Sequence, residues 1–149
     1  MFLIVVFTIL WIIHGYVAWK VIPTMGLSSS HAMIGYILVF FLSILPILPI
    51  LLRYSGNETR IIDRISLFGY TSLGFFVLSF LILLFKDLFG HALTFAGYLM
   101  RLENPIDDSK REFLKKSLTV GAIGISGLGT AYGFYSSRKG PSVITQEVY

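Results

Sequence analysis

Three long stretches without a charged side chain constrain this chain more than any other feature of its sequence. The first extends from Met1 to Trp19, the second from Ala32 to Leu52 and the third from Ile65 to Phe85. Each matches the roughly 20 residues that an α-helix needs to cross a hydrocarbon core of about 30 Å. They predict transmembrane helices over about 1–22, 32–52 and 65–85.

A fourth uncharged stretch, Ser117 to Ser137, is less apolar because it contains several glycines. It predicts a last span over 117–137, in which Gly129 and Gly133 form a small-xxx-small pair that permits close packing of another helix. The predicted fold is therefore an all-α integral membrane bundle of about four transmembrane helices. Residues 1–137 form this domain, and residues 138–149 form a tail that begins a further, soluble domain.

The composition agrees with a bilayer protein and excludes several classes of function. Hydrophobic residues make up 55% of the chain and charged residues 13%, whereas soluble domains carry roughly 25% charged residues. Cysteine is absent, which excludes disulfides and thiolate metal sites. The net charge of +4 comes from basic residues beside the spans, where the positive-inside effect explains them. The expected partner is the lipid bilayer, together with other membrane helices, and not nucleic acid.

Two segments of the apolar runs depart from a simple span. Pro46 and Pro49 near the end of the second span remove backbone hydrogen bonds and predict a kink. After the third span, a helix continuing from Ile65 to Met100 would be roughly 54 Å long, more than a bilayer needs. Residues 88–100 are therefore either a water-exposed extension or a helix in the headgroup layer, with Phe89, Phe95 and Tyr98 as anchors.

The distribution of basic residues predicts the orientation. With four spans, the second loop and the tail lie on one side, and the loops before the second and fourth spans lie on the other. The first side carries five basic residues: Arg53, Arg60, Arg64, Arg138 and Lys139. The second side carries seven: Lys20, Lys86, Arg101, Lys110, Arg111, Lys115 and Lys116. The positive-inside rule then places the 86–116 region in the cytoplasm and the tail outside the cytoplasm of a cell membrane.

Few residues could carry chemistry. His14 and His91 lie in apolar surroundings where a haem or a metal could be ligated, but neither has a second histidine four residues away. Asp87 is an ionisable residue next to a span, and such residues are functional candidates when they lie within the membrane. The simpler interpretation puts Lys86 and Asp87 at the cytoplasmic interface without a specific partner. No catalytic residue, metal ligand or cofactor is predicted within this chain.

One motif before the fourth span resembles a known signal. Ser109, Lys110, Arg111, Phe113, Leu114 and Lys115 follow the order of the twin-arginine export signal, Ser-Arg-Arg-x-Phe-Leu-Lys, with lysine in place of the first arginine. We interpret the segment as an uncleaved targeting or orientation element. The alternative is a basic stop at the inner face of the last span.

This motif, the glycine-rich span, the Tyr132 to Tyr135 segment and the exit at Arg138 to Pro141 together resemble the N-terminal region of bacterial multi-pass metallophosphoesterases of the calcineurin-like superfamily. The more specific part of the resemblance covers residues 109–148. It implies that the tail leads into a catalytic domain in which two divalent metals activate water for attack on a phosphoester. The Asp-x-His motif that begins such a site is absent from residues 1–149, so its catalytic residues are expected beyond Tyr149.

Three hypotheses remain open at this point. The chain is the membrane-anchoring region of a metal-dependent phosphoesterase, or a truncated form of one. It is instead a free-standing helper subunit that packs through Gly129 and Gly133 against a partner. The third hypothesis, a transporter or haem-bearing redox subunit, rests on His14, His91, Pro46 and Asp87.

Overall fold

The computed structural model describes residues 1–54, 56, 59–100 and 108–139, and these are almost entirely helical, with no strand among them. The order of elements is α1 (Phe2–Val21), the 3-10 helix η1 (Pro23–Met25), α2 (Ser29–Ile44), α3 (Leu48–Tyr54), α4 (Arg60–Leu99) and α5 (Asp108–Arg138). The all-α bundle expected from the sequence is confirmed. The tail over 140–149, the turn at Asn104 and Pro105, and the loop residues Ser55, Asn57 and Glu58 lie outside the described residues.

Three helical segments are long and apolar enough to cross a membrane: Ile4–Met25, Ser29–Tyr54 and Arg60–Leu99. They contain the second and third predicted spans and all but the first three residues of the first. The fourth predicted stretch is helical as part of α5, but α5 does not reach the same apolar character over the described residues. Its glycine, serine and threonine residues contribute little transfer free energy to the hydrocarbon core. The fourth membrane span therefore stays a prediction.

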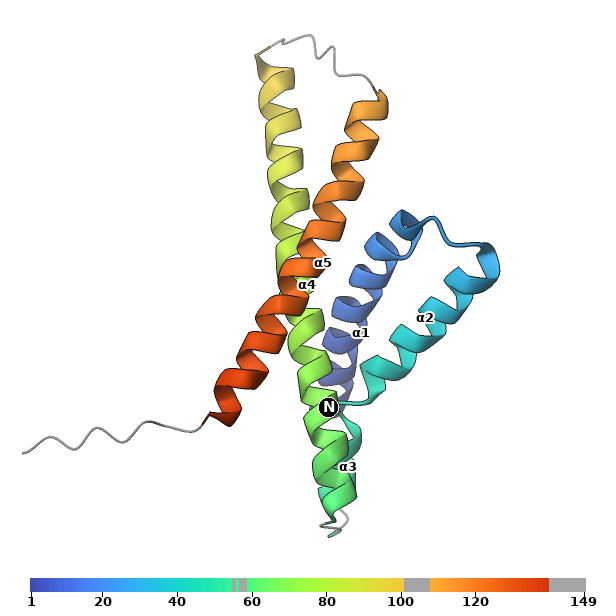
Figure 1. The fold of residues 1–149 in the computed structure, drawn as a ribbon, viewed down its shortest axis with the longest axis vertical. Coiled ribbons are helices and arrows are strands. Elements are labelled where there is room, and N and C mark those ends of the chain that lie inside the picture. The colour runs from blue at the N-terminus through green and yellow to red at the C-terminus, as the bar shows by residue number, and fades with distance from the viewer. Residues whose placement is uncertain (55, 57–58, 101–107, 140–149) are drawn as a thin grey trace, which may run out of the picture.

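The helices alternate in direction along the bundle (Figure 1). Helices α1 and α4 run the same way, whereas α2, α3 and α5 run the opposite way. The turn between α1 and α2 uses Gly26, whose φ of 63° is left-handed and ends η1. The end of α1 reaches only partway along α4, where Lys20 meets Asp87, and α4 continues beyond it to the end at which α5 begins (Figure 1).

The second span is interrupted at the prolines, which confirms the predicted kink. Helix α2 ends at Ile44, and α3 begins at Leu48 with a changed direction (Figure 1). Pro49 has no N–H to donate to the carbonyl four residues earlier, that of Leu45. This break lies against Gly69 of α4, where a built Cβ would be 2.8 Å from the Leu45 oxygen and 3.1 Å from the Pro46 Cα. Only glycine fits there without a backbone shift.

Helix α4 answers the question left open for residues 88–100. It is one helix of 40 residues, roughly 60 Å long, and it continues through Lys86 and Asp87 without a break. Residues 88–99 therefore extend the third span and are not a separate helix. The charged stretch before the fourth span is also helical, from Asp108 on. The helix is favoured here by the high helix propensity of its Lys, Glu and Leu residues and by the Glu112–Lys116 ion pair.

The bundle has a small core and an apolar outer surface. Val17 and Val21 of α1, Phe76 and Leu83 of α4 and Ala122 of α5 form the buried cluster. Many larger apolar side chains face outward, including Trp11, Phe41, Phe68 and Phe85. Since such a surface is stable in lipid and not in water, the arrangement is that of a membrane-embedded protein.

Candidate functional site

The strongest polar cluster joins α1 to α4 near the end of α1. Lys20 Nζ lies 2.6 Å from Asp87 Oδ2, and the Tyr16 hydroxyl donates a hydrogen bond of 2.7 Å to the same oxygen. Lys20 and Asp87 side chains are 28% and 20% exposed, so the pair is partly shielded from solvent. The Lys20 ammonium also lies 4.7 Å from the centre of the Trp19 ring. Asp87 is thus held by two groups of another helix.

Lys86 extends the cluster to α5. Its Nζ lies 3.6 Å from Asp87 Oδ1 and donates a 2.9 Å hydrogen bond to the Thr119 hydroxyl. The cluster therefore connects three helices through two ammonium groups, one carboxylate and two hydroxyls. A partly buried ion pair adds little net stability, because the cost of removing both charges from water offsets their attraction.

This cluster corrects the sequence interpretation of Asp87. We expected Asp87 and Lys86 at the interface without a specific partner, and the structure pairs Asp87 with Lys20. Sequence reasoning considered only the neighbouring Lys86, which does not share a helix face with Asp87. A signal was present, because Lys20 follows the end of the first apolar run and Asp87 lies two residues after the end of the third. The parallel course of α1 and α4 brings these two ends together.

His14 is buried in the middle of α1. The ring is 1% exposed and stacks on Phe76 of α4, with ring centres 4.1 Å apart. Its Nδ1 lies 2.8 Å from the Leu10 carbonyl oxygen, while Nε2 has no hydrogen-bond partner among the described residues. Ser79 Oγ of α4 is a second buried atom without a partner in this part of the chain.

The other histidine of the redox hypothesis, His91, lies on an exposed part of α4. Lys20 and Asp87 are in contact, His14 lies six residues before Lys20, and His91 lies four residues after Asp87. Since α1 and α4 run the same way, the two histidines are roughly 15 Å apart along the helix axes. The structure does not bring them together on one ion.

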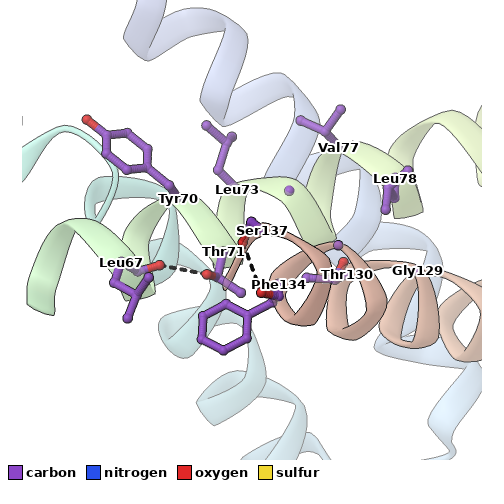
Figure 2. Close-up of a pocket in the computed structure, with 12 residues that line it drawn as sticks. Leu67, Tyr70, Thr71, Leu73, Val77, Leu78, Gly129, Thr130, Phe134 and Ser137 are labelled. Atoms are coloured by element: carbon purple, nitrogen blue, oxygen red, sulfur yellow. Dashed lines mark hydrogen bonds between the residues drawn. The ribbon is translucent and has the colours of Figure 1, made fainter. Parts of the chain in front are cut away.

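A groove of about 630 Å³ separates α4 from the second half of α5 (Figure 2). Gly74 of α4 and Gly129 and Gly133 of α5 line it, together with Tyr70 and Phe134. A Cβ at Gly129 would lie 3.5 Å from Leu78, and a Cβ at Gly133 would meet nothing within 4 Å. The predicted packing pair therefore faces an open groove, and its packing on a partner helix stays a prediction.

The basic motif forms the first turns of α5. Ser109, Lys110, Phe113, Leu114 and Lys115 all belong to this helix, and Phe113 and Leu114 are exposed. Glu112 and Lys116 form an exposed ion pair of 2.9 Å. The hydrogen bond and charge of Lys116 hold the pKa of Glu112 below its ordinary value of 4.5. The helix thus presents a basic and apolar surface suited to a membrane interface.

Across the described ranges, no group of three or more His, Asp or Glu side chains is placed to hold a metal ion. The side chains described above can fix helix register, bind a small molecule or anchor a helix end. No protein family, no curated protein and no solved structure matches this chain.

Proposed function

We propose that the chain is the membrane-anchoring region of a metal-dependent phosphoesterase whose catalytic domain follows Tyr149. The carrying observation is that α5 is one unbroken helix from Asp108 to Arg138. It joins the basic motif at its start to the Arg138–Lys139 exit at its end. Helix α5 packs on α4 through Ala122 of the buried cluster, and its second half, which leads to the tail, borders the groove.

The proposed orientation puts the basic start of α5 in the cytoplasm and the tail outside it. Two features support this orientation. The antiparallel course of α4 and α5 separates the two ends of α5 (Figure 1). Lys20, Lys86 and the lysines of the motif also gather toward one end, where they favour the cytoplasmic face. In this arrangement α5 is the fourth span, with its hydroxyl and glycine residues shielded in part by α4.

Reading the coding sequence beyond Tyr149 tests the proposed identity directly. An Asp-x-His motif in frame within a few dozen codons, followed by divalent-metal-dependent phosphoesterase activity in the extended protein, is the expected result. A stop codon followed by an unrelated gene would contradict the anchor hypothesis.

Charge reversal at the motif tests the orientation. An alkaline phosphatase reporter fused after Tyr149 is expected to be active in the unaltered chain, because this enzyme folds only outside the cytoplasm. Changing Lys110→Glu and Arg111→Glu together is expected to lower the activity per fusion protein several-fold. The matched control is Arg60→Glu with Arg64→Glu on the opposite side, which should leave the activity high. Equal activity of all three fusions would contradict the charge argument.

A helper subunit is the second candidate, and the groove between α4 and α5 favours it. The groove is open, apolar in its lining and bordered by Gly133, where an added Cβ would meet no atom within 4 Å. Because the chain has no cysteine, Gly133→Cys introduces a single cross-linking site. Specific cross-linking of a partner protein at this site, and none at a lipid-facing control such as Leu128→Cys, would support the helper function. Equal cross-linking at both positions would count against it.

A further inference from the structure

The groove between α4 and α5 extends from one end of the third span to its middle. On α4 the lining begins at Leu67 and ends at Leu78, a length of roughly 16 Å. The apolar stretch over 65–85 is long enough for a hydrocarbon core of about 30 Å. The groove is therefore about as long as one leaflet of that core is thick. A partner helix that crosses the whole bilayer would extend far beyond it.

The polar groups that line the groove are mostly satisfied within the chain. The hydroxyls of Thr71, Thr130 and Ser137 each donate a hydrogen bond of 2.7–2.9 Å to a carbonyl of their own helix. Figure 2 shows two of these bonds, those of Thr71 and Ser137. The lining residues, all of them in the described part of the chain, include no charged side chain. Such a surface suits a hydrocarbon chain better than a polar molecule, because a polar molecule would lose its hydrogen bonds to water there.

Two arginines flank the end of the groove that lies at the edge of the span. Arg64 lies three residues before Leu67 and seven before Thr71, so it shares the face of α4 to which these lining residues belong. Arg138 ends α5, and its guanidinium lies 4.8 Å from the centre of the Phe134 ring, which also lines the groove. Both arginines are exposed, and neither forms an ion pair with another described residue. The groove thus has positive charge at its headgroup end and apolar walls toward the middle of the bilayer.

We propose that this groove holds one acyl chain of an anionic glycerophospholipid, with the lipid phosphate beside Arg64 and Arg138. Guanidinium groups pair with phosphate through charge-assisted, often bidentate hydrogen bonds. A zwitterionic lipid would bring its own cation close to both arginines, so an anionic headgroup is favoured. The volume of about 630 Å³ lies within the range of roughly 300–1,000 Å³ that is usual for small-molecule sites. The inference rests on α5 as the proposed fourth span and not on a catalytic domain after Tyr149.

Native mass spectrometry of the full chain, delipidated in detergent micelles and then titrated with lipid, tests the proposal. The probe is dioleoyl-phosphatidylglycerol. Dioleoyl-phosphatidylcholine has the same chains and phosphate but carries a cation. We expect saturation at one phosphatidylglycerol per chain and about tenfold weaker binding of phosphatidylcholine. Equal affinity for the two lipids, or binding that does not saturate, would overturn the proposal. Retention of glycerol phosphate as strongly as the lipid would also overturn it, because the groove would then contribute nothing.

Filling the groove locates the acyl chain. Gly74→Leu adds a side chain to the lining from α4, where a Cβ meets no atom within 4 Å, and it is expected to abolish saturable binding. Gly90→Leu lies on the same helix outside the groove, also with open space at its Cβ, and should bind as the unaltered chain does. Unchanged binding by Gly74→Leu would refute the site. A dimer that Gly74→Leu disrupts, with no lipid retained by the unaltered chain, would assign the groove to a second copy instead.

Removing the arginines locates the phosphate. Arg64→Gln with Arg138→Gln is expected to abolish the preference for phosphatidylglycerol over phosphatidylcholine. The matched control, Lys110→Gln with Lys115→Gln, makes the same change in net charge at the other end of α5 and should keep the preference. Equal preference in both double variants would contradict the proposed phosphate position, even if Gly74→Leu does not fold.

The alkaline phosphatase fusion described above tests the fourth span separately. An active fusion together with no preference for phosphatidylglycerol would overturn the lipid site alone. An inactive fusion of the unaltered chain would overturn the fourth span and the lipid site with it.

Discussion

Helix α4 meets the break between α2 and α3 at one contact and meets α5 at another, and glycine lines both. At Gly69 a Cβ would lie 2.8 Å from a backbone oxygen, so the two backbones are in direct contact. At Gly133 a Cβ would meet nothing within 4 Å. The comparison shows that glycine spacing alone does not identify a close helix contact. A proline break that leaves a carbonyl without its helical donor is the more informative signal.

The chemistry at Gly69 explains the difference. Pro49 removes the N–H that would have bonded to the Leu45 carbonyl, and a Cα hydrogen of Gly69 lies where a Cβ would approach that oxygen. A Cα–H to carbonyl contact is a weak hydrogen bond that recurs at helix interfaces. Helices α4 and α5 contain no proline over their described residues, so no carbonyl beside the groove is freed in this way, and a Cβ at Gly133 would meet nothing within 4 Å.

The largest expected effect is that of Gly69→Ala. The added methyl would force the backbone at Leu45 and Pro46 to move, and we expect a loss of about 1–3 kcal/mol in the free energy of unfolding. Reversible unfolding in mixed detergent micelles, followed by circular dichroism, measures it. A variant as stable as the unaltered chain would show that the close contact does not constrain the bundle.

Asp87→Asn tests the third contact of α4, the ion pair with α1. The change leaves Lys20 and Lys86 near each other without a carboxylate, and we expect a loss of about 1–2 kcal/mol, between the values of exposed and buried pairs. Lys20→Met should restore part of this loss in a double-mutant cycle. Additive effects of the two substitutions would mean that the pair contributes no coupling energy.

Gly133→Ala should act in the opposite direction to Gly69→Ala. With open space for the methyl, the main effect is the lower conformational freedom of alanine, which stabilises a helix interior by about 0.5–1 kcal/mol. The same unfolding measurement serves, and the two variants are matched in chemistry. A destabilising Gly133→Ala would show that α5 packs more closely on α4 than the groove indicates.

The smallest effect is expected at Glu112, in the exposed first turns of α5. Because the pKa of Glu112 is lower in the folded chain than its ordinary value of 4.5, its contribution is present above that pH and is lost as pH falls through the folded pKa. Hydrogen exchange of the α5 amides should therefore quicken slightly at acidic pH relative to a Glu112→Gln control, after correction for intrinsic rates. An identical pH dependence of both chains would mean that the Lys116 pair has no effect on α5.

Much of the architecture was predictable, and the candidate site was not. The apolar runs predicted three spans and Pro46 predicted the kink, because insertion into lipid depends on local sums over side chains. The partner of Asp87 was missed, since pairing with Lys20 depends on which helices lie side by side. The significance of Gly69 was also missed, because a glycine inside an apolar run resembles any other until its neighbours are known.

The sequence by itself determined that most of this chain is suited to a lipid environment. It also determined where the apolar stretches that form the spans begin and end. Each such property is a sum of transfer free energies of consecutive residues and requires no knowledge of contacts. Only the tertiary structure decided that Lys20 meets Asp87, that Gly69 covers the break beside Pro46 and that the His14 ring is buried against Phe76. These depend on contacts of about 3–4 Å between residues distant in sequence, which hydrogen bonding and close packing fix only once the helices are assembled.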